Sequence, residues 1–542
     1  MKKISIPVLS LFFLFLPVTF LAQDLSGPGP MAPVNPGRSP LFGKDIPIYN
    51  LPEQNQRSEA VCSASNGSLY AAIVYDTNDC NGYAILHSTD NGLTWIKLYY
   101  SYVADPDLVF QNIQIAAIYD STCGSLIYVG VDYYEKILNR YCILIRRYQE
   151  TPFQYLGPVV WYCDTPFHDF AIACDTSTNL PDPKSIGVLY STTGVRDSLI
   201  IYSIAGNGLE AKSRQVIATS KKRINKVGLA YGRSATQDKG KYFAVWEEYA
   251  DQKAVSGNIF TAHSESDYNS KFTKPINLTA TDPSLANLCR NPVIACQSGD
   301  FDNDSTNLTE VILFEKYDSV SENYDIAGFY NKKAATGTIF TRLYIANTQA
   351  QEVQPDIIYN PYDSSFVVTC FDSTHKKLPL YRNDFNLKNP DNWECITAAY
   401  NDGELFSPPN PKIALNTSQK SVITTWTSKS ESGKGAATID APYFPPSGIL
   451  DPENSKPEQK INIWPNPCIT TMNLSFEQKT AGRVTVSVTN VLGQSAKILM
   501  DRYFLPGLHT VQFDVSGMQP GACFYTFRCG DTCQNGKFFV AK

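Results

Sequence analysis

SLYAAIVYDTNDCNGYAILHSTDNGLTWIKLYY, residues 68–100, contains three apolar stretches separated by short polar turns. Val, Ile, Leu and Tyr fill the apolar stretches, whereas Asn, Asp, Gly and Ser gather in the turns. Residues of the first kind favour strands, and those of the second kind favour tight turns. This part of the chain therefore predicts consecutive antiparallel strands, and we expect no amphipathic helix.

Similar segments recur along the chain at a nearly constant spacing. Aligned on one predicted strand, the seven equivalent positions are Leu69, Leu126, Ile186, Tyr242, Val311, Phe366 and Val422, with intervals of 57, 60, 56, 69, 55 and 56 residues. A period of this size with four short strands in each copy is typical of β-propeller blades. The sequence predicts an all-β, seven-bladed propeller over residues 43–443, with an open β-solenoid or two β-sandwiches as alternatives.

The last copy runs out of strands near Ala441, while a strand-like stretch without a copy of its own precedes the first one. That stretch, DIPIYNLPEQNQ at 45–56, resembles KPINLTATDP at 274–283, which is predicted to form a fourth strand. We therefore expect residues 46–51 to supply the outer strand of the last blade and to close the ring. Closure would hide sheet edges that an open array leaves exposed.

The N-terminus has the features of a secretory signal peptide at 1–22: Lys2 and Lys3, a long apolar run and then Ala22. A membrane anchor is the alternative, but Pro7 and Pro17 interrupt the run and no basic flank follows it. No later segment is apolar enough to span a membrane. Residues 23–42 are rich in Pro and Gly, as a linker would be.

The overall charge excludes one class of partner. The chain has 46 basic and 52 acidic residues, a formal net charge of −6, and a calculated isoelectric point near 5.5. Binding to nucleic acid depends mainly on a basic surface facing the phosphates. We therefore expect no nucleic-acid partner.

Fourteen cysteines follow the predicted signal peptide. Their even number and the expected oxidising compartment predict disulfides rather than zinc ligands, since the chain lacks a CxxC pair and has only five histidines. Sequence alone does not determine the connectivity. Proximity along the chain suggests the pairs Cys62–Cys80, Cys123–Cys142, Cys163–Cys174, Cys289–Cys296 and Cys370–Cys395.

A second Pro-rich linker, 444–460, precedes a module at 461–542 with alternating strands and Pro-Asn-Pro, Leu-Gly-Gln and Pro-Gly turns. The pattern predicts a small Ig-like antiparallel β-sandwich. The module resembles the type A C-terminal sorting domain of the type IX secretion system. The positions that carry the resemblance are Pro465, Asn466, Pro467, Gly493, Gly507, Asp514, Gly517 and Gly521.

This resemblance implies that the type IX machinery is a partner, that the protein crosses the outer membrane, and that it is then released or held on the cell surface. Trp464 stands where the family usually has Tyr, and the module contains four cysteines that the family does not require: Cys468, Cys523, Cys529 and Cys533. A generic accessory β-domain, such as a carbohydrate binder, is the alternative.

The stretch HSTDNGLTW at 87–95 fits the pattern Ser-x-Asp-x-Gly-x-Thr-Trp, with Ser88, Asp90, Gly92, Thr94 and Trp95 at the defining positions. It resembles the Asp box, or BNR repeat, of sialidases and many other propellers. In that family the box is a turn between the third and fourth strands, away from the ligand-binding funnel. The resemblance implies a structural role for these residues.

A sialidase active site is not expected. The family has an Arg-Ile-Pro motif before the first box, whereas here Arg223 and Ile224 are followed by Asn225, far downstream of the box. Glu247 and Glu248 are adjacent carboxylates, but alternation along a strand sends them to opposite faces, and a solvated strand end explains them. No catalytic set of residues is recognised.

One loop suggests a metal. Asp300, Asp302 and Asp304 stand at alternate positions of GDFDNDST and offer oxygen ligands for Ca²⁺, with Glu310 as a more distant fourth acid. A solvated acidic turn is the alternative. Calcium is the only cofactor that the sequence suggests.

Together, these features predict a secreted or surface-attached propeller that binds an extracellular glycan or protein. A glycan-active hydrolase with a sialidase-like fold is the principal alternative, and a purely structural adhesin is the third. Two carboxylates about 5 to 10 Å apart at the funnel would favour hydrolysis.

Overall fold

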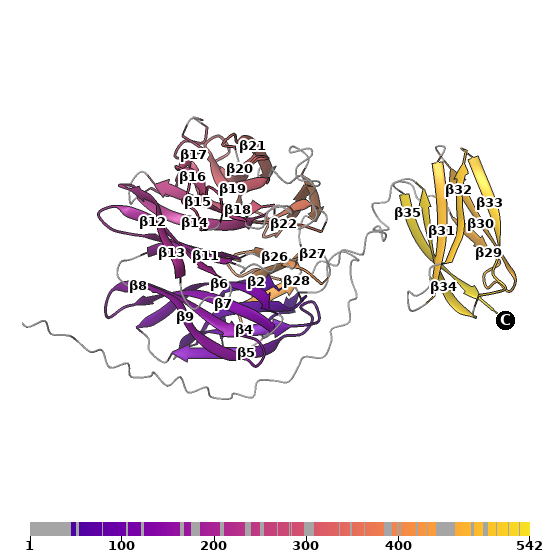
Figure 1. The fold of residues 1–542 in the computed structure, drawn as a ribbon, viewed down its shortest axis with the longest axis horizontal. Coiled ribbons are helices and arrows are strands. Elements are labelled where there is room, and N and C mark those ends of the chain that lie inside the picture. Colours follow the sequence, from indigo (N-terminus) through magenta and orange to yellow (C-terminus); the bar gives the residue numbers. More distant parts are fainter. Residues whose placement is uncertain are drawn as a thin grey trace, which may run out of the picture. The chain divides into compact units, whose positions relative to one another are not determined.

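The computed structural model describes residues 45–440 and 461–541 apart from gaps, the longest of which are 175–184, 298–307 and 384–392. Every element of these residues is a β-strand, and none of them forms a helix that could cross a membrane. The contacts divide the chain into two compact units, with the division along the sequence after residue 442. Figure 1 shows both units as layers of strands. The all-β fold class is confirmed.

The first unit consists of sheets in which strands consecutive in sequence are also neighbours in space. We number these sheets in chain order. Sheet 1 contains β2 (Asn55–Ser63), β3 (Leu69–Asp76), β4 (Asn81–Ser88) and β5 (Ile96–Val103); sheet 2 contains β6 (Leu108–Asp120), β7 (Gly124–Glu135), β8 (Arg140–Gln149) and β9 (Gln154–Tyr162); and sheet 3 contains β10 (Phe167–Cys174), β11 (Ser185–Thr192), β12 (Asp197–Ala205) and β13 (Ala211–Ser220).

The remaining sheets of this unit repeat the arrangement. Sheets 4 and 5 are joined by a single pairing between Gly257 and Cys289. Sheet 4 contains β14 (Arg223–Gly232), β15 (Lys241–Tyr249), β16 (Gly257–His263) and β17 (Ile276–Asn277); sheet 5 contains β18 (Cys289–Cys296), β19 (Glu310–Asp318), β20 (Asn323–Asn331) and β21 (Thr341–Ala346); sheet 6 contains β22 (Glu352–Asn360), β23 (Ser365–Asp372), β24 (Leu380–Asn383) and β25 (Glu394–Thr397); and sheet 7 contains β26 (Lys412–Asn416), β27 (Ser421–Lys429), β28 (Gly435–Asp440) and β1 (Ile46–Pro47).

Sheet 7 combines strands from both ends of the unit. β1 pairs antiparallel with β28, with Ile46 opposite Ile439 and Pro47 opposite Thr438. The first strand of each sheet contacts the first strand of the next one, and β26 of sheet 7 contacts β2 of sheet 1. These first strands are therefore the inner strands, and their contacts form a cycle.

Apolar side chains fill the spaces between neighbouring sheets. One cluster joins Tyr70 and Ile85 of sheet 1 to Ile127 and Tyr148 of sheet 2, and similar clusters lie at the following boundaries. At the boundary of sheets 7 and 1, β1 and its continuation add their side chains to the cluster that includes Ile48, Leu69, Ile423 and Ile439. The sheets are thus held mainly by buried apolar area.

The second unit has two facing sheets. One has the order β29 (Asn462–Trp464), β30 (Thr471–Gln478), β33 (Gly507–Asp514), and the other has the order β32 (Lys497–Phe504), β31 (Gly482–Asn490), β34 (Gly521–Cys529), β35 (Thr532–Val540). Alternate residues of both sheets point into a shared core that includes Leu474, Phe476, Val486 and Phe527. This two-layer packing is that of a β-sandwich.

Most of the suggested disulfide pairs are wrong. Cys289 and Cys296 are the two ends of strand β18, and seven extended steps separate them by roughly 23 Å, too far for a disulfide. Cys62 and Cys80 lie toward opposite ends of sheet 1, because Cys62 is opposite Tyr70, which is opposite His87 at the far end of β4. All four have free thiols.

The other suggested pairs differ in outcome. Cys370 is a free thiol, and strand β24 lies between its strand and that of Cys395. Cys142 is disulfide-bonded, but Cys123 lies outside the described residues, so that pairing stays a prediction. Cys163 also lies outside them.

Two histidines lie against aromatic rings in the first unit. The ring of His87 stacks on Tyr70 at 4.9 Å between centroids and lies 3.4 Å from Glu150. The ring of His263 lies 5.5 Å from that of Phe243, in a position where burial and then the charge of Lys241 lower its pKa to about 4. Burial also lowers the pKa of His87, against the opposing effect of Glu150, so both rings are neutral at neutral pH.

The substitution His263→Gln tests this environment. In the unfolded chain His263 titrates near pH 6.5, whereas in the folded chain it resists protonation until about pH 4. The stability that the neutral ring contributes is complete above pH 6.5 and is lost as the pH falls toward 4. The loss in the free energy of unfolding is on the order of 1 to 2 kcal/mol, because solvent screens the partly exposed ring. Urea unfolding from pH 7.5 to 4.5 should show a shallower decline for the variant; parallel curves would contradict the prediction.

The substitution Ile48→Ala tests the boundary of sheets 7 and 1. Ile48 is 3% exposed, and its truncation should lower the free energy of unfolding of the first unit by about 2 to 4 kcal/mol through the cavity it leaves. Ile339→Ala is the matched control, because Ile339 is 82% exposed and should change stability by less than about 0.5 kcal/mol. Urea unfolding followed by fluorescence measures both; equal effects would refute a packed boundary.

Candidate functional site

The inner strands share an irregularity near their starts. The pairing of the first strand with the second shifts by a bulge in sheets 1 to 6, for example between Ile224 and Val227 in β14 and between Arg290 and Val293 in β18. A bulge leaves backbone N–H groups without ladder partners. Since each bulge lies near the start of its strand, the bulges gather at one end of the first unit.

Buried carboxylates accept hydrogen bonds from these N–H groups. Glu247, on the second strand of sheet 4, is fully buried and faces the bulge of β14. Its Oε1 accepts from the side-chain Nδ2 of Asn225 at 2.6 Å and from the backbone N of Lys226 at 3.2 Å. Its Oε2 accepts from the backbone N of Asn291, in the next sheet, at 2.6 Å. One carboxylate therefore connects two inner strands.

The same arrangement occurs in sheet 5. Glu315 accepts hydrogen bonds from Arg290 Nε at 2.6 Å and Asn291 Nδ2 at 2.7 Å, and from the backbone N of Gln354 in sheet 6 at 2.8 Å. Asn291 and Gln354 have φ of 51° and 55°, a left-handed conformation that directs their N–H groups away from the ladder. Both residues precede a proline.

Polar side chains bridge the sheets all the way around the unit. We call these contacts the inter-sheet hydrogen bonds. They join Arg57 to Phe110 O, Gln114 to Phe170 O and Ile172 N, Asp169 to Val227 N, Glu247 to Asn291 N, Glu315 to Gln354 N, Asp356 to Ile413 N, and Gln56 to Ala437 N.

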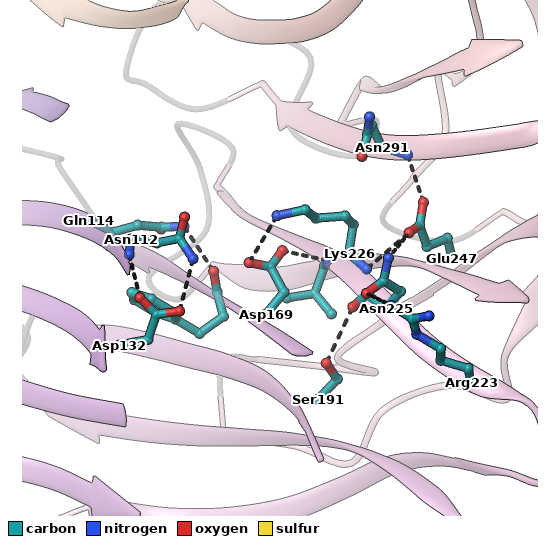
Figure 2. A network of polar contacts seen from close by, with 12 residues as sticks. Asn112, Gln114, Asp132, Asp169, Ser191, Arg223, Asn225, Lys226, Glu247 and Asn291 are labelled. Carbon is teal, nitrogen blue, oxygen red and sulfur yellow. Dashed lines mark hydrogen bonds and ion pairs between the residues drawn. The ribbon is translucent and has the colours of Figure 1, made fainter. Parts of the chain in front are cut away.

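Lys226 is a charged side chain at this end that has ionic neighbours and access to solvent (Figure 2). Its side chain is 44% exposed, and its Nζ lies 3.5 Å from Asp169 Oδ1. Asp169 foremost, and then Glu247 and Asp132, raise the pKa of Lys226 despite the opposing effect of burial. The ammonium group is therefore charged at any physiological pH and is held among three acids.

The acids around Lys226 are already occupied by hydrogen bonds. Asp132 is 3% exposed and accepts from both the backbone N and the side-chain Nδ2 of Asn112. Burial raises the pKa of Asp132 to about 6 and also raises that of Glu247. Such carboxyls stabilise backbone geometry, whereas Lys226 and the amide side chain of Asn225 could contact a bound molecule.

The residues of the 87–95 stretch form a compact turn between β4 and β5. Asp90 Oδ1 accepts from Ser88 Oγ and from Thr94 N, both at 2.8 Å, and Asp90 Oδ2 accepts from Thr94 Oγ1 at 2.6 Å. Burial would raise the pKa of Asp90, but the hydrogen bonds from Thr94 and Ser88 hold it below its ordinary value. The carboxylate is thus fully engaged inside the turn.

This turn also packs against sheet 7. Gly92 has φ of 87°, and a Cβ there would lie 3.2 Å from Ile439 and 3.4 Å from Ile423. Trp95 donates its indole N–H to Gly92 O at 3.0 Å and packs on the cluster at that boundary. The turn belongs to the opposite ends of the strands from the bulges and therefore does not meet Lys226.

The proposed calcium ligands Asp300, Asp302 and Asp304 lie outside the described residues. Glu310 is described, is 1% exposed, and accepts a hydrogen bond from Asn331 Nδ2 at 3.2 Å. Burial raises its pKa to about 8. Glu310 is therefore placed as a buried acid of the β19–β20 pair. In the described part of the chain, no group of His, Cys, Asp and Glu could hold a metal ion.

The sorting-motif residues lie at turns of the second unit. Asn466 Oδ1 accepts from Phe539 N at 2.8 Å, which links the Pro465–Pro467 turn to the last strand. Asp514 accepts from Ser516 N at 2.9 Å in the turn that contains Gly517.

Two glycines begin strands of this unit. Gly507 and Gly521 have φ of 139° and 135°, which side chains disfavour. Gly493 lies outside the described residues.

The sequence did not predict a role for four residues of this end: Asp132, Asp169, Lys226 and Asn291. The interpretation of Glu247 as a solvated strand end is wrong, because this residue is fully buried. One signal was available. An amide residue precedes Pro at the start of the inner strands in RNPVIAC, VQPDIIY and PNPKIAL, and NKVGLAY has Asn at the matching place. Asn225, Asn291 and Gln354 lie within bulges, whereas Asn410 lies before β26, whose pairing with β27 is regular.

Comparison with known proteins gives one match in sequence. Residues 462–541 match the family described as the secretion system C-terminal sorting domain. No curated protein matches the chain.

Several solved structures resemble the chain with TM-scores below 0.5, which carry no argument about its activity. A protein of unknown function from Dyadobacter fermentans is 11% identical, with a TM-score of 0.39, and covers 73% of this chain and 97% of its own. The WD40 domain of SCAP from fission yeast is 9% identical, with a TM-score of 0.35 and coverages of 74% and 98%. An endo-arabinase from Bacteroides thetaiotaomicron is 13% identical, with a TM-score of 0.28 and coverages of 67% and 99%.

The motifs of the second unit and the family match agree on the same residues. They also agree on a destination, because this domain directs export across the outer membrane to the cell surface or the extracellular space. Residues 462–541 are a C-terminal sorting domain of the type IX secretion system, and the chain is one of its exported proteins.

Proposed function

We propose that residues 43–443 form a seven-bladed β-propeller, closed by β1, that binds an extracellular glycan or protein after export. The cyclic contacts of the inner strands and the inter-sheet hydrogen bonds support closure. The turn at 87–95 supports an Asp-box blade. In this proposal residues 1–22 are removed as a signal peptide, and 444–460 link the propeller to the sorting domain.

The binding site is the end of the unit where the bulges gather. Lys226 supplies a permanent cation there, and Asn225 supplies an amide, from the inner strand of sheet 4. Hydroxyl groups of a sugar or carboxylate groups of either ligand class could accept hydrogen bonds from the ammonium group. An anionic or hydroxyl-rich ligand fits this site best.

One observation favours binding over hydrolysis. Glycoside hydrolysis requires two carboxyl groups that reach the substrate as acid and base or nucleophile. The three acids nearest to Lys226 instead accept hydrogen bonds from backbone N–H groups, and all are less than 9% exposed. A glycan-active hydrolase remains the second candidate, because these acids gather at one place with raised pKa values for two of them.

The substitution Glu247→Gln separates these roles. The side-chain amide of glutamine has one oxygen that accepts and one NH₂ group that donates, whereas both oxygens of Glu247 accept. One backbone N–H would therefore lie against the NH₂ group without an acceptor, and we expect the free energy of unfolding to fall by about 1 to 3 kcal/mol. Glu248→Gln is the matched control in the next position, where the carboxylate accepts from Ser220 and from Trp246. Thermal unfolding measures both variants, with glycan binding and release of reducing sugar alongside. Loss of sugar release without loss of stability would favour the hydrolase.

The substitution Lys226→Ala tests the site itself. The chain without residues 1–22 is applied to a glycan array and to extracellular matrix proteins, and the affinity for its best ligand is then measured by titration. We expect the variant to bind at least tenfold more weakly, because a charged hydrogen bond is lost. Lys274→Ala is the control, since Lys274 is exposed in the loop between β16 and β17, at the opposite end of sheet 4. Unchanged affinity in Lys226→Ala would exclude this end as the site.

A further inference from the structure

The hairpins that join second and third strands lie at the same end as the bulges. In an antiparallel sheet the start of the first strand, the end of the second and the start of the third share one end. The tips of these hairpins therefore lie at that end of the unit. Two neighbouring hairpins, β7–β8 of sheet 2 and β11–β12 of sheet 3, carry aliphatic side chains at the tip.

More than half of the surface of each of these aliphatic residues is exposed to solvent. Ile137 is 74% exposed, Leu138 is 55% exposed, and Val195 is fully exposed. Single exposed aliphatic residues are ordinary on a protein surface. Here they occupy the turns of adjacent sheets at one end of the unit. The corresponding turns of sheets 4 and 5 carry one exposed valine each, Val255 and Val320, whereas those of sheets 6 and 7 have Lys376 and Gly433.

Cations surround the same tips. Lys136 directly precedes Ile137, and Arg196 directly follows Val195. Because Asp197 is opposite Ser220 in the pairing of β12 with β13, Lys221 and Lys222 adjoin the Val195 turn. Arg196, Lys221 and Lys222 are exposed, and none of them has an ion-pair partner among the described residues.

Both tips are held firmly by the hydrogen bonds beneath them. Asp197 accepts from Gly194 N at 3.3 Å within its turn and from Ile224 N of sheet 4 at 2.9 Å. The backbone N of Lys136 donates to Asp107 O at 2.7 Å. At the base of the same hairpin, Arg140 pairs with Glu135 at 2.7 Å, and the rings of Tyr134 and Tyr141 lie 4.6 Å apart. The aliphatic side chains are thus presented on fixed turns.

Aliphatic tips flanked by cations match the chemistry of an anionic lipid surface. Aliphatic side chains insert into the boundary between headgroups and acyl chains, while Lys and Arg contact the anionic headgroups. Protein interfaces, in contrast, are depleted in Lys and enriched in aromatic residues. Export brings the protein to the outer side of the outer membrane.

We propose that the β7–β8 and β11–β12 hairpins dock on an anionic lipid surface, with Ile137, Leu138 and Val195 inserted and Arg196, Lys221 and Lys222 on the headgroups. The docking uses side chains other than Lys226, at the same end of the unit. Each cation contributes about fivefold to partitioning at low salt. Salt therefore weakens the attachment, and a surface of uncharged lipid does not support it.

Flotation with lipid vesicles tests the proposal. The chain without residues 1–22 is mixed with vesicles of phosphatidylcholine alone or with three-tenths phosphatidylglycerol. We expect flotation with the anionic vesicles, little with the neutral ones, and release by 0.5 M NaCl. The same tests on the variants I137S/L138S/V195S and R196Q/K221Q/K222Q should show at least tenfold weaker partitioning for each. Their thermal unfolding and ligand binding should match the parent, because the changed side chains are exposed.

The control is Val320→Ser at the tip of the β19–β20 hairpin of sheet 5. Val320 is 92% exposed, but Asp318 and Glu322 flank it, so its loss should leave flotation unchanged. Absence of flotation with anionic vesicles, or equal flotation of parent and both triple variants, would overturn the proposal. Attachment to outer-membrane fragments without attachment to lipid vesicles would also overturn it and would indicate a protein partner.

Discussion

The acceptance of backbone hydrogen bonds by buried carboxylates is the interaction on which the inner part of this structure depends. A bulge near the start of an inner strand frees N–H groups from the ladder, and such groups are costly to bury without an acceptor. Glu247 satisfies such groups in its own sheet and in the next sheet at once, and Glu315 satisfies one in the next sheet. The position of each sheet is therefore fixed by its neighbour as well as by apolar packing.

The need to satisfy these N–H groups explains why acids gather near the proposed ligand site. It also explains why the same acids do not form an evident catalytic site. The carboxylates of Asp132, Asp169 and Glu247 are needed by the backbone, and the side chain that reaches solvent among them is a lysine. A surface with a fixed cation and amide groups suits recognition more than bond cleavage. The sorting domain directs export, and the first unit provides the surfaces that are available for binding after export.

The fold could be predicted from the sequence further than the candidate site could. Alternating apolar residues and turn residues repeat in every sheet, so strands, the all-β class and the added N-terminal strand followed from local patterns. Glu247 could not be interpreted in this way, because its burial depends on a bulge in a strand that lies some twenty residues earlier and on Asn291 in the next sheet. Pairing by proximity failed for the cysteines for a similar reason. Cys289 and Cys296 are near in number but extended apart along one strand.

Strand β1, which comes from the start of the chain and completes sheet 7, has a consequence for folding. β1 pairs with β28, so contacts between Ile46 and Ile439 connect residues that are 393 positions apart. Closing so long a segment is entropically costly, and contacts of this kind form late. Until residues 438 and 439 are available, β1 has no strand to pair with, and its edge stays open to other strands. We expect the order of synthesis to place the last folding step after almost the whole first unit has emerged, so that a chaperone acting on this protein would protect the edges of its first and last sheets.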